Sequence, residues 1–264
     1  PYRRETLRHA MNEGVLLLFI ASAAYATSRA LSHLDRRAGA PGAGIRAAAW
    51  RAAGAGAAGL AAQTKLNGAF AVVGMIIVVA FAAMRHDQGW VARMRRTGSA
   101  ALLVGGVSFA VFIAANPSLW SDPLREPVRA VRARAEVTRA QLQLPDGRGL
   151  GGRPDRISIV ASRVFVDCAL VPLRTAGPIL FAAGAGGAIA GLFGWMRRRN
   201  HNHALASLVI LGAAVSLPML LTPLDRPRFY VLPVVFSGMA AAAGLAWTAR
   251  ALLHSIAKTR WRTT

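Results

Sequence analysis

Long apolar stretches separated by short arginine-rich connectors run through the whole chain, and they constrain its fold more than any other feature. Hydrophobic residues make up 54% of the 264 residues and charged residues 16%, yet the formal net charge is +21. The positive charge is therefore concentrated between the apolar segments, which is typical of a polytopic membrane protein. A nucleic-acid-binding protein with this excess would usually carry its arginines along helix faces or in a disordered tail, so we expect no nucleic-acid partner.

The lengths of the apolar stretches predict an all-α bundle of about seven membrane-spanning helices. An α-helix rises about 1.5 Å per residue, so roughly 20 residues cross the hydrocarbon core. The expected spans cover residues 14–31, 47–63, 66–84, 98–115, 176–196, 204–223 and 229–248. The second span is the weakest, because it is rich in alanine and glycine and carries Arg51 near its start. We expect residues 1–264 to form a single transmembrane domain.

The distribution of basic residues predicts how this bundle is oriented. Arginine-rich connectors occur around residues 36–46, 85–96 and 197–199 and in the tail at 250–262, all on one side if every span is real. The positive-inside rule places that side in the cytoplasm. The extracytoplasmic side then carries a turn at Lys65, the long loop 116–175 and a short turn at 224–228. We expect a multi-pass protein of the bacterial plasma membrane.

The loop 116–175 is expected to carry amphipathic helices that lie in the membrane interface. Apolar residues recur at helical spacing at Leu124, Val128, Val131, Ala135 and Leu142, with Arg125, Arg129, Arg132 and Arg139 on the opposite face. A basic helix of this kind attracts anionic lipid, so membrane lipids are an expected partner. A solvated helix covering the mouths of the spans is the alternative. Asp122 is expected to cap this helix, and residues 157–173 form a second interfacial segment.

Four short segments carry a resemblance to a known family. Residues 59–67 read GLAAQTKLN, residues 116–123 read NPSLWSDP, residues 224–233 read LDRPRFYVLP, and Glu13 precedes the first apolar run. In their order along the chain, beginning with Glu13, they resemble motifs of polytopic glycosyltransferases of the GT-C type, in the branch of protein mannosyltransferases and aminoarabinose transferases. These enzymes take sugars from polyprenyl-phosphate carriers, and the four segments cover the C-terminal part of the membrane domain in that family.

The resemblance implies an enzyme that moves a hexosyl or pentosyl sugar from a polyprenyl-phosphate carrier to a protein, glycan or lipid acceptor on the extracytoplasmic face. Lys65, Arg226 and Arg228 would bind the lipid phosphate, because a phosphate leaving group needs positive charge where water is scarce. Lys65 is notable as one of only two lysines among 32 basic residues. Glu13 could hold a divalent cation, the one cofactor considered, or orient one of these basic side chains.

The resemblance also places a catalytic aspartate in a first outer loop that would precede the first span of this chain. Nothing in the sequence matches that loop, so no catalytic base is assigned, and Glu13 is the one residue of this chain considered for a catalytic role. The chain begins at Pro1 rather than at a methionine. We therefore expect a fragment that lacks its N-terminal spans, with a truncated relative without activity as the alternative.

The same residues allow plainer interpretations. Lys65 could be an interfacial lysine that ends a short span, Glu13 a first-turn carboxylate of a helix, and the arginines at 226 and 228 partners of a local ion pair. A transporter or flippase for an anionic lipid or solute would use the same cations, although no internal repeat of spans is evident. His201 and His203 lack a third metal ligand nearby in the sequence, so we expect no metal site there.

Overall fold

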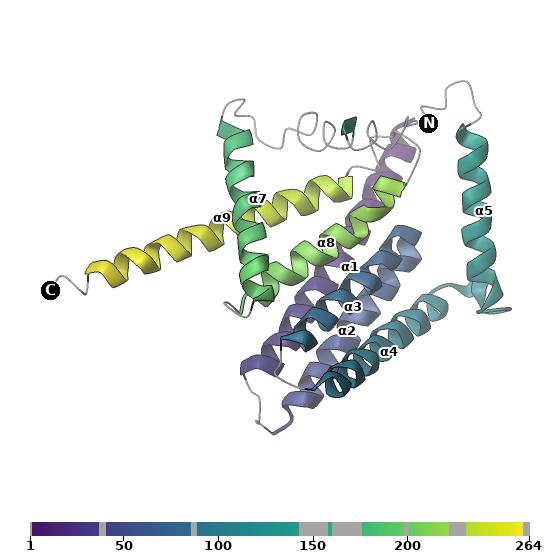
Figure 1. Ribbon diagram of the computed structural model, residues 1–264. Coiled ribbons are helices and arrows are strands. Elements are labelled where there is room, and N and C mark those ends of the chain that lie inside the picture. The colour runs from purple at the N-terminus through teal and green to yellow at the C-terminus, as the bar shows by residue number, and fades with distance from the viewer. Residues whose placement is uncertain are drawn as a thin grey trace.

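The computed structural model describes residues 2–36, 41–85, 89–142, 158–159, 176–197, 201–221 and 231–260, and these residues form helices without a strand (Figure 1). The elements are α1 (Tyr2–Arg36), α2 (Ala43–Thr64), η1 (Leu66–Gly68), α3 (Ala69–Met84), α4 (Trp90–Ala114), η2 (Pro117–Leu119), α5 (Arg125–Leu142), α7 (Ala176–Met196), α8 (His203–Leu221) and α9 (Val231–Arg260). The expected all-α class is confirmed for this part of the chain.

Four of these helices contain segments long and apolar enough to cross a membrane. They are Glu13–Asp35 of α1, Trp90–Ala114 of α4, Ile179–Met196 of α7 and Val231–Leu253 of α9. Two shorter apolar helices, Ala69–Met84 and His203–Pro218, come from α3 and α8. The structure thus supports a helical membrane protein with four segments of spanning length among the described residues, and the larger number of about seven spans stays a prediction.

The helices pack into one connected assembly in which α8 is the link (Figure 1). Helices α1, α2 and α3 contact one another, and α4 packs against α2 and α3. Helix α8 packs against both α1 and α3, and α7 and α9 pack together and against α8. The fully buried side chains at its centre include Leu16, Ile20, Met75, Val78, Leu211 and Val215. The core therefore joins α1, α3 and α8, which brings together segments from the two halves of the sequence.

Small residues allow the helices to approach closely, as in membrane bundles where lipid removes most of the hydrophobic drive for helix pairing. A side chain on Gly59 of α2 would place its Cβ 2.5 Å from the carbonyl oxygen of Ser108 in α4. The Ser108 hydroxyl in turn donates a hydrogen bond of 2.8 Å to the Ala55 carbonyl. On the other side of the molecule, Gly184 of α7 lies against Ala241 of α9 in the same way.

The helix ends gather into two groups at opposite ends of α1. Glu13, near the start of the apolar part of α1, meets Lys65 at the end of α2. Asp35, near the other end of α1, meets His203 at the start of α8. We call the first group the Lys65 end. We call the second group the basic end, because the arginine-rich connectors at 36–46, 85–96 and 197–199 all adjoin helix ends of that group.

Helix α5 stands apart from the bundle, and its main contact is with η2 (Figure 1). Asp122 caps it, because the Asp122 carboxylate accepts a hydrogen bond of 3.0 Å from the Arg125 backbone N–H. Val128 and Val131 remain about half exposed, at 49% and 53%. The expected helix and its cap are confirmed, and its position in the headgroup plane stays a prediction.

Candidate functional site

The Lys65 end is built on a break between two helices. Helix α2 stops at Thr64, whose hydroxyl donates to the Leu60 carbonyl at 2.9 Å, and Lys65 has an extended backbone with φ −154° and ψ 139°. Gly68 packs directly on the backbone of Ala61, where a Cβ would collide. The glycine therefore lets the chain turn back tightly into α3. The expected division into two helices at this turn is confirmed.

Lys65 Nζ and Glu13 Oε1 form an ion pair across this break. The side chain of Glu13 is 11% exposed and that of Lys65 is 34% exposed. The Glu13 carboxylate, the more buried of the two groups, needs a nearby cation, because burying an unpaired charge is costly. The pair thus fixes the direction of the Lys65 side chain at the end of α2.

The second carboxylate oxygen of Glu13 is buried and has no hydrogen-bond partner in the described part of the chain. An unsatisfied buried acceptor costs about 1–3 kcal/mol. This oxygen can therefore accept a hydrogen bond from a bound molecule beside the Lys65 ammonium group.

Of the four residues predicted from the sequence, the structure brings Glu13 and Lys65 together. Arg226 and Arg228 lie outside the described residues. The roles of all four residues stay predictions. The pairing of Glu13 with Lys65 agrees with the expectation that both residues lie on the same side of the membrane. Of the two roles considered for Glu13, it favours orienting a basic side chain over holding a divalent cation.

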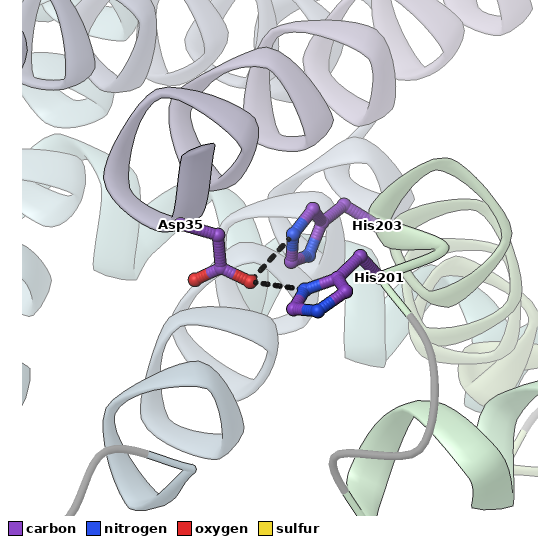
Figure 2. A group of neighbouring side chains, drawn as sticks. All are labelled: Asp35, His201 and His203. Atoms are coloured by element: carbon purple, nitrogen blue, oxygen red, sulfur yellow. Dashed lines mark hydrogen bonds and ion pairs between the residues drawn. The ribbon is translucent and has the colours of Figure 1, made fainter. Parts of the chain in front are cut away.

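A second polar cluster occupies the basic end and was not expected from the sequence (Figure 2). One oxygen of Asp35, Oδ2, lies 3.0 Å from His201 Nδ1 and 2.9 Å from His203 Nε2. Figure 2 shows both rings, at the start of α8, turned toward the carboxylate of α1. The potential ligand atoms of the three residues lie within 4.8 Å of one another, so the group has the composition of a metal site.

The protons in this cluster argue against a metal ion. The Trp195 indole N–H donates to His203 Nδ1 at 2.9 Å, so the ring proton of neutral His203 lies on Nε2, the atom 2.9 Å from Asp35 Oδ2. The angle of this contact is outside hydrogen-bond geometry, so Asp35 and His203 interact as an ion pair. A metal at Nε2 would displace that proton and require Nδ1 to give up its bond with Trp195. The Arg85 guanidinium, 4.9 Å from the centre of the Trp195 ring, adds a positive charge that opposes a cation.

We interpret the cluster of Asp35, His201 and His203 as a polar lock between helices. It ties α1 to α8, and through Trp195 it also holds α7. The expectation that the two histidines have no third potential ligand nearby was wrong, since Asp35 lies beside both. The sequence did not show this contact, because Asp35 is 166 positions from His201. The position of Asp35, an acidic residue at the end of an apolar stretch and next to Arg36 and Arg37, was the sequence feature that would have indicated a polar contact there.

No protein-family model, curated protein or solved structure matches this chain. The resemblance to GT-C glycosyltransferases therefore depends on the four sequence segments, and a function has to be argued from the sites themselves.

Proposed function

We propose that the protein is a membrane glycosyltransferase that moves a sugar from a polyprenyl-phosphate carrier to an acceptor on the extracytoplasmic face. The single observation that supports this most is the partly buried ion pair of Glu13 and Lys65, at the end of the bundle away from the arginine-rich connectors. The positive-inside rule assigns that end to the extracytoplasmic side. A lipid-linked phosphate would enter there from the outer leaflet.

In this proposal Lys65 stabilises the negative charge that develops on the leaving phosphate. Charge stabilisation is strong in a site that excludes water, and removing one such group typically costs about 100- to 1000-fold in rate. Glu13 holds the ammonium group at the break between α2 and η1 before substrate arrives. The free Glu13 oxygen then accepts a hydrogen bond from a sugar or acceptor hydroxyl.

A divalent cation is not needed for these roles. The described residues at the Lys65 end supply one carboxylate, and the Lys65 ammonium already neutralises it. A hard cation prefers several oxygen ligands and no adjacent positive charge. We therefore assign Glu13 to positioning Lys65 rather than to metal binding, and no catalytic base is assigned to residues 1–264.

The proposal includes a multi-pass arrangement of about seven spans, in which α2, α3 and α8 cross the membrane together with α1, α4, α7 and α9. The loop 116–175 then faces the same side as Lys65, with α5 on the outer leaflet, and Arg226 and Arg228 would join Lys65 around the lipid phosphate. The expected location is a bacterial plasma membrane.

The test is sugar transfer from polyprenyl-phosphate-linked hexoses and pentoses by the purified full-length protein, with the spans expected before residue 1, in proteoliposomes. Lys65→Met should lower the transfer rate by about 100-fold or more. The matched control is Lys258→Met, which changes the chain's other lysine, near the end of α9. Equal rates for the Lys65 variant and the wild type, or no transfer by the wild type with any of these donors, would contradict the proposal. Movement of the lipid across the bilayer without transfer would favour a flippase.

A further inference from the structure

A groove of about 440 Å³ opens between α1 and α8 at the basic end and reaches Met239 of α9. Its wall changes character along α1. Arg29, Ser28 and Ser32 line the part near the helix end, together with His201, whereas Ala21, Ala24 and Leu208 line the part deeper in the bundle. We propose that this groove binds an anionic phospholipid, with the phosphate at Arg29 and an acyl chain along the alanine wall.

Arg29 supplies the charge that would recognise the phosphate. Its side chain is exposed, and its guanidinium lies 5.8 Å from the centre of the Trp50 ring, so the indole face orients it. No carboxylate pairs with it among the described residues. An arginine that lies inside an apolar helix without an acidic partner is suited to an anion from outside the chain.

The start of α8 adds a second source of positive potential at the same place. The side chain of Asn202, which lines the groove, accepts a hydrogen bond of 3.1 Å from the Leu205 backbone N–H and so caps the helix. The N-terminal turn of an α-helix carries a partial positive charge that favours anions. Arg29 and this helix end thus approach the polar part of the groove from α1 and α8.

The apolar part of the groove indicates a lipid rather than a free phosphate ion. Ala21 precedes Arg29 by two turns, so the apolar wall extends about 12 Å from the arginine toward the middle of α1. A neighbouring hollow of about 390 Å³, lined by Tyr25, Trp50 and Ala53, shares Ala21 and Tyr25 with the groove. Inorganic phosphate would gain nothing from these walls, whereas acyl chains would contact them.

Charge complementarity selects the anionic class of lipid. The positive-inside rule directs the basic end toward the cytoplasmic leaflet, where anionic lipids are concentrated, and basic pockets between helices on that side bind such headgroups. The groove is independent of the proposed transfer reaction, because it lies at the opposite end of α1 from Glu13 and Lys65.

The test is native mass spectrometry of the detergent-solubilised protein, titrated with phosphatidylglycerol or with phosphatidylcholine of the same chains. The wild type should retain phosphatidylglycerol in preference to phosphatidylcholine. Arg29→Gln should lower its affinity for phosphatidylglycerol about fivefold, the effect of one basic residue near a lipid phosphate. Arg46→Gln is the matched control, because Arg46 is exposed and does not line the groove. Equal phosphatidylglycerol binding by the Arg29 variant and the wild type would overturn the proposal.

Two further arms separate a lipid from a free anion. Ala21→Phe fills the wall shared by the two hollows, and it should weaken phosphatidylglycerol binding while circular dichroism and elution volume stay unchanged. Inorganic phosphate at millimolar concentration should leave lipid binding intact. Complete displacement by inorganic phosphate, together with normal binding by the Ala21 variant, would show a simple anion site and overturn the assignment to a lipid.

Discussion

The two ends of α1 hold carboxylates in contrasting states. At the basic end one oxygen of Asp35 is shared by two histidine rings, and the nearer ring is held from behind by the Trp195 indole. At the Lys65 end Glu13 has one ion-pair partner and a second buried oxygen that has no hydrogen-bond partner in the described structure. The Asp35 carboxylate therefore has two histidine partners, although the contact with His203 Nε2 lacks hydrogen-bond geometry, whereas Glu13 has one partner and an oxygen that accepts no hydrogen bond.

Under the proposed function, this difference assigns a structural role to Asp35 and a role in substrate binding to Glu13. A carboxylate that links three helices contributes to stability, and its loss leaves several polar groups unsatisfied. A carboxylate with a spare acceptor beside an ammonium group contributes little more to stability than its ion pair does. It is, however, well placed to bind a substrate. The comparison predicts opposite effects of matching substitutions at the two ends.

The largest expected effect is on sugar transfer. Glu13→Gln removes the charge that holds Lys65 in place, and it should lower the transfer rate by about 10- to 100-fold, somewhat less than loss of the lysine itself. Asp35→Asn, at the other end of the same helix, should change the rate less than twofold. The comparison would fail if the Asp35 variant lost as much activity as the Glu13 variant at equal expression.

The next effect is on stability, where the Asp35 variant should lose more than the Glu13 variant. Asp35→Ala removes the carboxylate that lies within 3.0 Å of both His201 and His203, and it should lower the free energy of unfolding by about 1–3 kcal/mol. Glu13→Ala should cost less, because Lys65 is one-third exposed and can turn toward the headgroups. Thermal denaturation in one detergent measures both variants, and a larger loss for the Glu13 variant would count against the polar lock.

The sequence predicted part of this organisation well. A single helix across residues 52–84 would be too long for a bilayer, so the break at Lys65 followed from length, and the structure has it. The predicted start of α4 was less accurate, since the expected span begins at residue 98 whereas the helix begins at Trp90. Arg93, Arg95 and Arg96 are good helix formers, so the helix extends outside the apolar stretch that hydropathy detects.

The sites were harder to predict than the helices. Glu13 and Lys65 were singled out one at a time, by the resemblance and by the rarity of lysine, but their direct contact across 52 positions depends on how α1 and α2 pack. The link between Asp35 and the histidines depends on α8 returning to α1 after most of the chain has intervened. Hydrophobic periodicity describes the faces of each helix and does not fix which faces meet.

A smaller effect is expected at the third helix of the polar lock. Trp195→Phe keeps most of the buried ring but removes the indole N–H that holds His203, and it should lower the free energy of unfolding by about 1 kcal/mol. Trp90→Phe is the control, because Trp90 is 71% exposed and lies outside the cluster. A loss no larger than that of the Trp90 variant would show that Trp195 does not support His203.

The smallest expected effect is that of added metal. If Asp35, His201 and His203 act as a polar lock without a metal ion, micromolar Zn²⁺ should leave the melting temperature of the wild type unchanged. A metal ion that binds the folded state alone at 100 times its dissociation constant would add about 2.7 kcal/mol of stability. A rise in melting temperature with Zn²⁺ that disappears in His201→Ala would replace the lock with a metal site.

The most direct test of the contrast between the ends is their exposure to opposite faces of the membrane. In a Cys168→Ser background, a single cysteine is introduced at Asn67, beside Lys65, or at Arg46, at the basic end, and intact cells are treated with a membrane-impermeant maleimide. The account predicts that the cysteine at position 67 is labelled in intact cells, and that the one at position 46 is labelled only after the membrane is permeabilised. Labelling of position 46 but not position 67 in intact cells would place Lys65 in the cytoplasm and contradict the proposed site.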